Sequence, residues 1–211
     1  MPNLSQAPTH IIRTSTTSGD ASKGEPTLLV SNTSNYDFIY NDYGCGASMD
    51  IGVWRPRPAD TSFFILGDYA QPNYSPATGD SIIVKAINDD PDNPLLKAPT
   101  DYLQVWNDSG TGGRYDGSFW FPVAPDGYHT IGYVCVNEYK KPAIANYMCV
   151  RRDLTEITPV GKLIWKDTGA RTTMDISTFQ VDYVPGVFVA QADYNPYAKD
   201  CYRLKGITDL R

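Results

Sequence analysis

Aspartates spaced eight residues apart are the residues of this sequence whose type and spacing could do chemistry. Asp42 and Asp50 enclose one glycine-rich loop, and Asp108 and Asp116 enclose another. Two carboxylates on one loop could act as general acid and general base in a hydrolytic reaction. Carboxylates and backbone amides also suit the hydroxyl groups of sugars, and a nearby aromatic ring can stack on a sugar ring. The pairs therefore predict either a hydrolytic site or a ligand-binding site.

Repetition of the pattern favours binding over catalysis. A third pair, Asp167 and Asp175, has the same spacing. Acid–base catalysis needs two carboxylates in different environments, whereas repeated turns produce similar ones. The sequence has only two histidines, His10 and His129, and no nucleophile-elbow, zinc-protease or phosphate-loop motif. We therefore predict that the protein is not an enzyme, and that His129 is a partly buried structural residue in a strand.

An internal repeat places these aspartates. In each copy the first Asp is followed by Gly after two residues, by the second Asp after eight, and by an aromatic residue after twelve. The pattern predicts three short strands per copy. The first strand should end at Asp-x-Gly, where the Asp side chain is expected to bond the backbone two residues on and the Gly to take a positive φ. The third strands are expected at residues 63–67, 128–132 and 187–191.

Sheets of this kind bury their faces only by packing together. We predict an all-β fold, a three-fold pseudo-symmetric β-prism of three antiparallel sheets, with a β-trefoil or a β-sandwich as alternatives. The tryptophans at repeat positions are expected in its core. A strand at 81–87 should lie outside the repeats. The expected organisation is a flexible segment at 1–26 and a single domain at 27–211, with repeat units near 36–75, 100–150 and 160–197.

Composition and charge narrow the class of protein. The 211 residues are 41% hydrophobic and 20% charged, and they include 17 Gly, 16 Pro and 15 Tyr, which fits a soluble globular chain of short strands. A net charge of −6 argues against a nucleic-acid partner. No apolar run approaches the roughly 20 residues that span a bilayer, so we predict no transmembrane segment. Residues 1–26 lack the apolar core of a secretory signal, which predicts a cytoplasmic protein or one secreted without a classical signal. The sequence leaves the oligomeric state open.

Metal and disulfide signals are incomplete. Asp89, Asp90 and Asp92 offer oxygen ligands of the kind calcium accepts, as do the Asp-x-Gly loops, but their spacing differs from that of the common calcium loop. We predict no metal site and no cofactor, with calcium as the alternative. Cys135 and Cys149 flank a polar turn, and both a disulfide and two free thiols fit this arrangement.

The middle of the chain resembles a known family. The segments that carry the resemblance include Val105–Gly110, Phe119–Pro122, Ala124–Tyr128 and Cys149–Leu154. Over about residues 36–195 the chain resembles the homologues of vacuolar protein sorting-associated protein 62, and the third unit departs from the pattern because it lacks Trp-x-Pro and the terminal Gly. The resemblance implies no catalytic residues. Because similar β-prism modules are attached to membrane-attack-type pore-forming proteins, it implies membrane or glycan recognition.

The loop residues are the expected contacts. The spacing Gly-x-x-x-Asp, present in the first two loops, is similar to one used by β-prism lectins of the jacalin kind, and Arg171 replaces this glycine in the third. We predict a lectin-like recognition module for glycans or lipid headgroups at membrane surfaces. The alternatives are a membrane-active toxin or defence protein, based on the Ser/Thr-rich residues 15–34, and a vacuolar-sorting protein that acts through protein partners. The candidate ligand-binding residues are Asp42, Tyr43, Gly46, Asp50, Asp108, Gly112, Tyr115 and Asp116.

Overall fold

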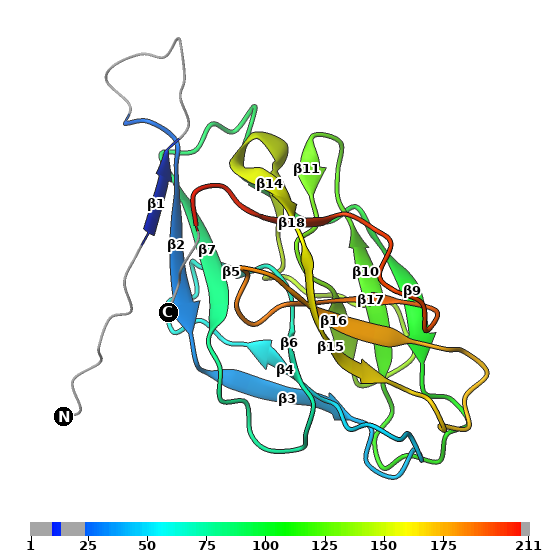
Figure 1. Cartoon of the computed structure of the whole chain (residues 1–211). Helices are drawn as coiled ribbons and strands as arrows, with labels where there is room; N and C mark the ends of the chain where they lie inside the picture. Colours follow the sequence, from blue (N-terminus) through cyan, green and yellow to red (C-terminus); the bar gives the residue numbers. More distant parts are fainter. Residues whose placement is uncertain (1–9, 14–23, 208–211) are drawn as a thin grey trace, which may run out of the picture.

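The computed structural model describes residues 10–13 and 24–207, and this part of the chain is almost entirely β-structure (Figure 1). Its helical content is a three-residue 3-10 helix, η1 (Arg152–Leu154). The prediction of an all-β protein is therefore confirmed.

Each repeat forms a three-stranded antiparallel sheet of its own, with the second strand of the repeat in the middle. The first sheet contains β3 (Tyr36–Asn41), β4 (Gly52–Pro56) and β6 (Tyr69–Gln71). The second contains β9 (Asp101–Asn107), β10 (Ser118–Val123) and β12 (Val134–Val136). The third contains β15 (Val160–Lys166), β16 (Ser177–Val181) and β17 (Phe188–Gln191).

The three sheets share an irregularity in the first strand. In the second sheet Trp106 pairs with Phe119, but Trp120 pairs with Gln104, so β9 carries one extra residue. Shifts at the corresponding positions interrupt β3 and β15. A bulge re-aims the side chains next to it. In each sheet an aromatic residue beside the bulge is consequently fully buried: Tyr40, Trp106 and Trp165.

These aromatic side chains form the centre of the core. The rings of Trp106 and Trp165 lie edge to face with centroids 5.4 Å apart, and Phe119 packs against both. Trp54 and Trp120 are also buried. The expectation that the tryptophans belong to the core is confirmed.

The third strands differ from the sequence prediction in two repeats. The third strand of the last repeat, β17, lies within the predicted residues 187–191. In the first two repeats, β6 and β12 begin after the predicted ranges 63–67 and 128–132 have ended. Those ranges instead contribute β5 (Phe64–Ile65) and β11 (Tyr128–His129), which pair in other sheets. The prediction was wrong there because the apolar runs pair with strands of other sheets. The chain then passes a neighbouring repeat at Gly67 or Gly132 before it rejoins its own sheet.

The close contact between repeats explains why residues 67 and 132 are glycines. A Cβ on Gly132 would lie 2.8 Å from the Cβ of Val187 and 2.9 Å from the carbonyl oxygen of Leu66. A Cβ on Gly67 would lie 3.0 Å from the Cα of Gly132. The Gly132 N–H donates to the Leu66 carbonyl at 2.8 Å. The first two repeats thus meet backbone to backbone, with the Val187 side chain of the third packed against them, an approach that a side chain on either glycine would prevent.

A buried ion pair joins the first sheet to the second. Arg55 Nε and Nη2 donate to the two carboxylate oxygens of Asp68 at 3.0 and 2.8 Å, and Asp68 also accepts the N–H of Cys135 in β12 at 2.8 Å. The Asp68 side chain is fully buried and that of Arg55 is 20% exposed. Burial opposes the charge of the Arg55 guanidinium, but the contact with Asp68 outweighs it and raises the pKa of Arg55.

The remaining strands cover the repeats. β1 (His10–Arg13), β2 (Thr27–Thr33), β7 (Ser81–Ile87) and β5 form a four-stranded sheet on the left of Figure 1, and β7 confirms the strand predicted at 81–87. β11, β13 (Cys149–Arg151) and β8 (Leu96–Lys97) form another sheet, and β14 (Thr155–Thr158) pairs with β18 (Cys201–Leu204). Of the segment predicted to be flexible, residues 10–13 are paired with β2, while residues 1–9 and 14–23 lie outside the described residues.

Candidate functional site

The loops that join the first and second strands of the three sheets meet at one end of the molecule, at the lower right of Figure 1. We call residues 42–50, 108–116 and 167–175 the loop end. The Arg114 N–H donates to the Tyr43 carbonyl at 2.9 Å, which joins the first two loops. The Ser48 N–H donates to the Thr168 carbonyl at 2.8 Å, which joins the first loop to the third. Segments far apart in the sequence therefore form one surface.

The first aspartate of each loop is buried and closes the loop. Asp42 Oδ1 accepts the N–H of Ile51 at 2.9 Å. The equivalent bonds join Asp108 to Gly117 at 2.9 Å and Asp167 to Ile176 at 3.0 Å. These bonds span nine residues, so the expected bond to the backbone two residues on was wrong. Asn41, the residue before Asp42, makes that bond instead, because Asp42 points inward while Asn41 remains beside the turn.

The glycine of each Asp-x-Gly motif has the backbone that the sequence predicted. Gly44, Gly110 and Gly169 have φ values of +90°, +87° and +96°. Gly46 and Gly112 of the Gly-x-x-x-Asp pattern are also in the left-handed region, at +84° and +74°. This region favours glycine over other residues. Since Arg171 is not among the residues with positive φ, the third loop follows a different path at this position.

Indole groups from neighbouring repeats hold two of the buried aspartates. Trp165 Nε1 donates to Asp42 Oδ2 at 2.9 Å and contacts the Met49 carbonyl at 3.1 Å. Trp106 Nε1 donates to Asp167 Oδ2, also at 2.9 Å. The core aromatic residue of one repeat thus anchors the loop of another.

The first repeat has Tyr40 where the other two have a tryptophan, and Gly117 makes room for its ring. Tyr40 occupies the place of the tryptophan, and its hydroxyl has no hydrogen-bond partner among the described residues. A Cβ on Gly117 would lie 2.3 Å from the Tyr40 ring, so glycine is needed there to admit the ring. Among the described residues, Asp108 therefore lacks the indole donor that Asp42 and Asp167 have.

Three tyrosines at the loop end were missed in the sequence. Tyr74 donates to Asp50 at 2.8 Å, and Tyr194 donates to Asp167 at 2.8 Å. Tyr139 bridges both aspartates of its loop, Asp108 at 2.9 Å and Asp116 at 3.0 Å. Each tyrosine lies three residues after the end of the third strand of its repeat. This spacing is the sequence signal for the three tyrosines, and it can be read only from the true strand ends, which in two repeats lie beyond the predicted ranges.

Burial sets the protonation of these groups. It raises the pKa of Asp42, Asp108 and Asp167, and the backbone N–H donors partly offset the rise. Burial and then the hydrogen bonds to carboxylates raise the pKa of Tyr74 and Tyr139 well above the ordinary tyrosine value. The tyrosine hydroxyls therefore stay protonated and act as donors at neutral pH.

The candidate binding residues divide by exposure. Asp42 and Asp108 are buried and serve the loop structure. Tyr115 is half-buried against Phe38, with ring centroids 5.2 Å apart. The remaining candidates are exposed at the loop end: Tyr43, Gly46, Asp50, Gly112 and Asp116. Contact between these groups and a ligand stays a prediction.

The other chemical groups that the sequence singled out are separate from the loop end. His129 Nδ1 lies 2.7 Å from Thr155 Oγ1, and its ring stacks on Tyr202 with centroids 3.7 Å apart, which fits the expected structural role. Burial and then the charge of Arg152 lower the pKa of His129. All four cysteines are buried free thiols. Cys135 and Cys149 therefore form no disulfide, which was one of the two arrangements that the sequence allowed.

The carboxylates of the acidic loop at residues 89–92 accept hydrogen bonds from the backbone of the same segment. Asp89 Oδ1 accepts the N–H of Leu95 and Asp90 Oδ1 accepts that of Asp92, both at 3.0 Å. Within residues 10–13 and 24–207, no three His, Cys, Asp or Glu side chains are grouped so that they could hold a metal ion. The same ranges contain no helix with the length and apolar character needed to cross a bilayer. Calcium binding stays a prediction.

The fold and the loop end define an all-β protein of three repeated antiparallel sheets. The chain belongs to the vacuolar protein sorting-associated protein 62 family, whose model matches residues 5–185. The resemblance seen in the sequence is therefore confirmed. The structure is also similar to the crystal structure of GNIP1Aa from Chromobacterium piscinae, with a TM-score of 0.67 and 28% sequence identity. That match covers 80% of this chain but 33% of the other, so this chain spans about a third of GNIP1Aa. None of the curated proteins matches this chain.

Proposed function

We propose that this protein is a non-catalytic recognition module that binds glycans or lipid headgroups at membrane surfaces through the loop end. The observation that carries the proposal is the meeting of three polar loops on one surface, joined by the Tyr43–Arg114 and Ser48–Thr168 backbone bonds. A surface assembled from several loops on a rigid scaffold is a common form of binding site.

We further infer that the three sheets form a β-prism around a pseudo-three-fold axis. Three features support this architecture: the same strand order, the same bulge in each first strand, and the contacts of Gly67, Gly132 and Val187 between repeats. In such a prism the three loops would be equivalent tips. Arg171 in the place of Gly46 and Gly112 then limits the equivalent binding loops to two.

Preorganisation supports a binding role. The buried aspartates, the indole donors and the tyrosine hydroxyls fix each loop from the inside. Because the loops are already ordered, a ligand would not have to order them, and this lowers the entropic cost of binding. Tyr43 is 56% exposed and offers an aromatic ring next to Tyr74, which donates to Asp50. The exposed carboxylates of Asp50 and Asp116 can accept hydrogen bonds from hydroxyl groups.

A glycan array and liposome flotation, each with and without calcium, test the proposal. Tyr43→Ala and Asp116→Asn are the informative variants, because both residues are exposed and Asn can still accept the Tyr139 hydrogen bond. Ile157→Ala is the matched control, since Ile157 is 66% exposed on β14, outside the loop end. We expect each loop variant to weaken binding about tenfold and the control to leave it unchanged. The proposal fails if the protein binds no glycan and no vesicle, or if neither loop variant reduces binding.

The alternative of a membrane-active protein depended on residues 15–34. Residues 15–23 lie outside the described residues, and Thr27–Thr33 forms β2, which pairs with β1 on one side and with β7 on the other. Rearrangement of this segment would break both pairings. Dye release from vesicles distinguishes the two functions, and we expect binding without release. A sorting role through protein partners would instead give neither vesicle nor glycan binding.

A further inference from the structure

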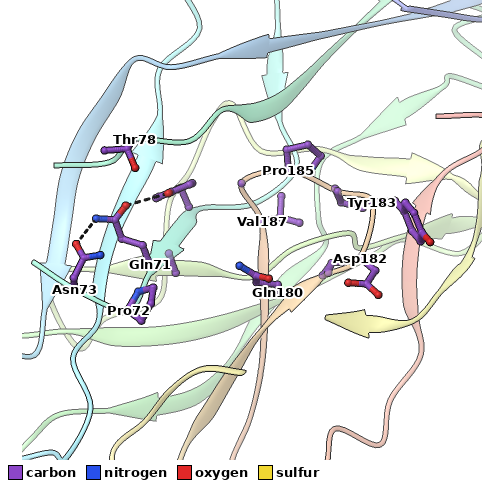
Figure 2. A pocket seen from close by; sticks show the side chains of 14 residues that line it. Gln71, Pro72, Asn73, Thr78, Gln180, Asp182, Tyr183, Pro185 and Val187 are labelled. Atoms are coloured by element: carbon purple, nitrogen blue, oxygen red, sulfur yellow. Dashed lines mark hydrogen bonds between the residues drawn. The ribbon is translucent and has the colours of Figure 1, made fainter. Parts of the chain in front are cut away.

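The repeated sheets meet at junctions that are filled in different ways. In each repeat one residue follows the aromatic residue of the second strand: Arg55, Phe121 and Gln180. Arg55 forms the ion pair with Asp68, which also binds Cys135 of the second sheet. Phe121 packs against Tyr133 of its own repeat with ring centroids 5.2 Å apart, beside a smaller pocket of about 280 Å³ that faces the third repeat. Gln180 has no such partner among the described residues, and a groove of about 620 Å³ opens beside it (Figure 2).

The groove runs between the first sheet and the third. One wall is formed by the end of β6 and the turn after it, including Gln71 and Asn73, and the other by Gln180 and the β16–β17 turn (Figure 2). Its volume lies within the range of roughly 300–1,000 Å³ that small-molecule sites have. The groove is therefore large enough for a ligand, and it is distinct from the loop residues of the proposed function.

The lining is polar and carries unused hydrogen-bonding groups. In the β6 wall the Gln71 amide nitrogen donates to Asn73 at 2.6 Å and to the Ser75 carbonyl at 2.8 Å. The side chains of Gln180 and Asp182 make no hydrogen bond with the described residues, yet both line the groove. Amides both donate and accept, and a carboxylate accepts. Such a set matches hydroxyl groups, which also donate and accept.

Charge decides among polar ligands. None of the fourteen residues that line the groove is Lys or Arg, and Asp182 is the acidic residue among them. A phosphate or sulfate group in the groove would face the Asp182 carboxylate, and the nearby Arg203 is already paired with Glu156 at 3.0 Å. The polar walls do not suit an acyl chain either. The lining therefore favours a neutral, hydroxyl-rich ligand.

A strained tyrosine stands at the rim. Tyr183 has a φ of +61°, in the left-handed region that bulky residues rarely adopt, and it is 56% exposed. The Arg203 guanidinium lies 4.7 Å from the ring centroid. Glycine would take this backbone without strain, so tyrosine here costs conformational free energy that a function of its ring would explain. An exposed aromatic ring at the rim of a polar groove can stack on a sugar ring.

We propose that the groove between β6 and the β16–β17 turn binds a neutral saccharide, with Tyr183 as the stacking group and Gln180, Asp182 and Asn73 as hydrogen-bonding groups. None of the residues that line the groove is a candidate loop residue; the two sites come nearest at Asn73, which precedes Tyr74, the partner of Tyr43 and Asp50. The proposal does not depend on the function of the loop end. A module with both sites would contact a glycosylated surface at two places.

The test uses an array of neutral, sialylated and sulfated glycans, followed by calorimetry with the neutral oligosaccharides that bind. Tyr183→Gly removes the ring and relieves the backbone strain, so the thermal unfolding midpoint should stay the same or rise while affinity falls about tenfold. Gln180→Ala should weaken binding by a smaller factor of about three. Tyr183→Phe, which keeps the ring, should retain binding.

Calorimetry separates this site from the loop end: Tyr183→Gly should remove the groove site, and Tyr43→Ala should remove only the binding that the loops contribute. Leu103→Ala is the control for both, since Leu103 is 55% exposed on β9, outside the loop end and the groove, and it should leave binding unchanged. The groove proposal is overturned if no neutral oligosaccharide binds, if only sulfated or sialylated glycans bind, or if Tyr183→Gly binds as tightly as the natural protein. Loss of neutral-saccharide binding in Tyr43→Ala but not in Tyr183→Gly would also overturn it and would assign the sugar to the loop end.

Discussion

The buried ion pair between Arg55 and Asp68 gives the sharpest prediction about stability. Asp68 is fully buried and takes two hydrogen bonds from the guanidinium at 3.0 and 2.8 Å. Arg55→Met would leave this carboxylate buried with the Cys135 N–H as its remaining donor. Removing one partner of a buried pair typically costs about 3–5 kcal/mol, a large share of the ordinary stability of a domain. We therefore expect Arg55→Met to lower the free energy of unfolding by about that amount.

Denaturant unfolding followed by tryptophan fluorescence measures the change. The matched control is Arg57→Met, because Arg57 and Asp37 form an ion pair whose side chains are 65% and 62% exposed, and such pairs contribute about 0–1 kcal/mol. In the double variant Arg55→Met with Asp68→Asn no charge stays buried, so its loss should be smaller than the sum of the single losses by about 1–3 kcal/mol. A cost below about 1 kcal/mol for Arg55→Met, or strict additivity, would refute the reasoning.

Three further predictions concern single groups. Because the pKa of His129 is lowered in the folded protein, the stability that its neutral form contributes is fully present above pH 6.5 and is lost as the pH falls through the folded pKa. The free energy of unfolding should therefore drop between pH 7.5 and pH 5 in the natural protein, and should drop less in His129→Phe. An equal dependence of stability on pH in the two proteins would count against this. Gly132→Ala should lower the free energy of unfolding by about 1–3 kcal/mol, measured by denaturant unfolding, because its Cβ would meet Val187 and the neighbouring backbone. Gly113→Ala should cost less, since a Cβ there would have more room. Equal costs would contradict the close packing at Gly132. The four buried thiols, with the pKa of Cys45 raised by burial to about 12, should resist a thiol reagent in the native state and react after unfolding, and rapid native labelling would contradict their burial.

The repeat was readable from the sequence because it depends on local chemistry. Asp-x-Gly marks a turn wherever it occurs, and glycine at Gly44 and Gly110 is required by the backbone of the turn itself. Aromatic residues at fixed distances from these turns fell in the core, as Trp106 and Trp165 do. The all-β class follows from the same local signals.

The partners of these residues were decided only by the tertiary structure. Nothing near Asp42 in the sequence indicates that its carboxylate accepts the indole N–H of Trp165, 123 residues away. The third strands β6 and β12 begin where packing between repeats ends, which no local apolar run reveals. The groove beside Gln180 lies between the first and third sheets, where Gln180 takes the place that Arg55 and its ion pair with Asp68 have in the first repeat. Turn chemistry is set by neighbours along the chain, whereas burial, junctions and grooves depend on which distant segments meet, and that is set by the packing of the whole molecule.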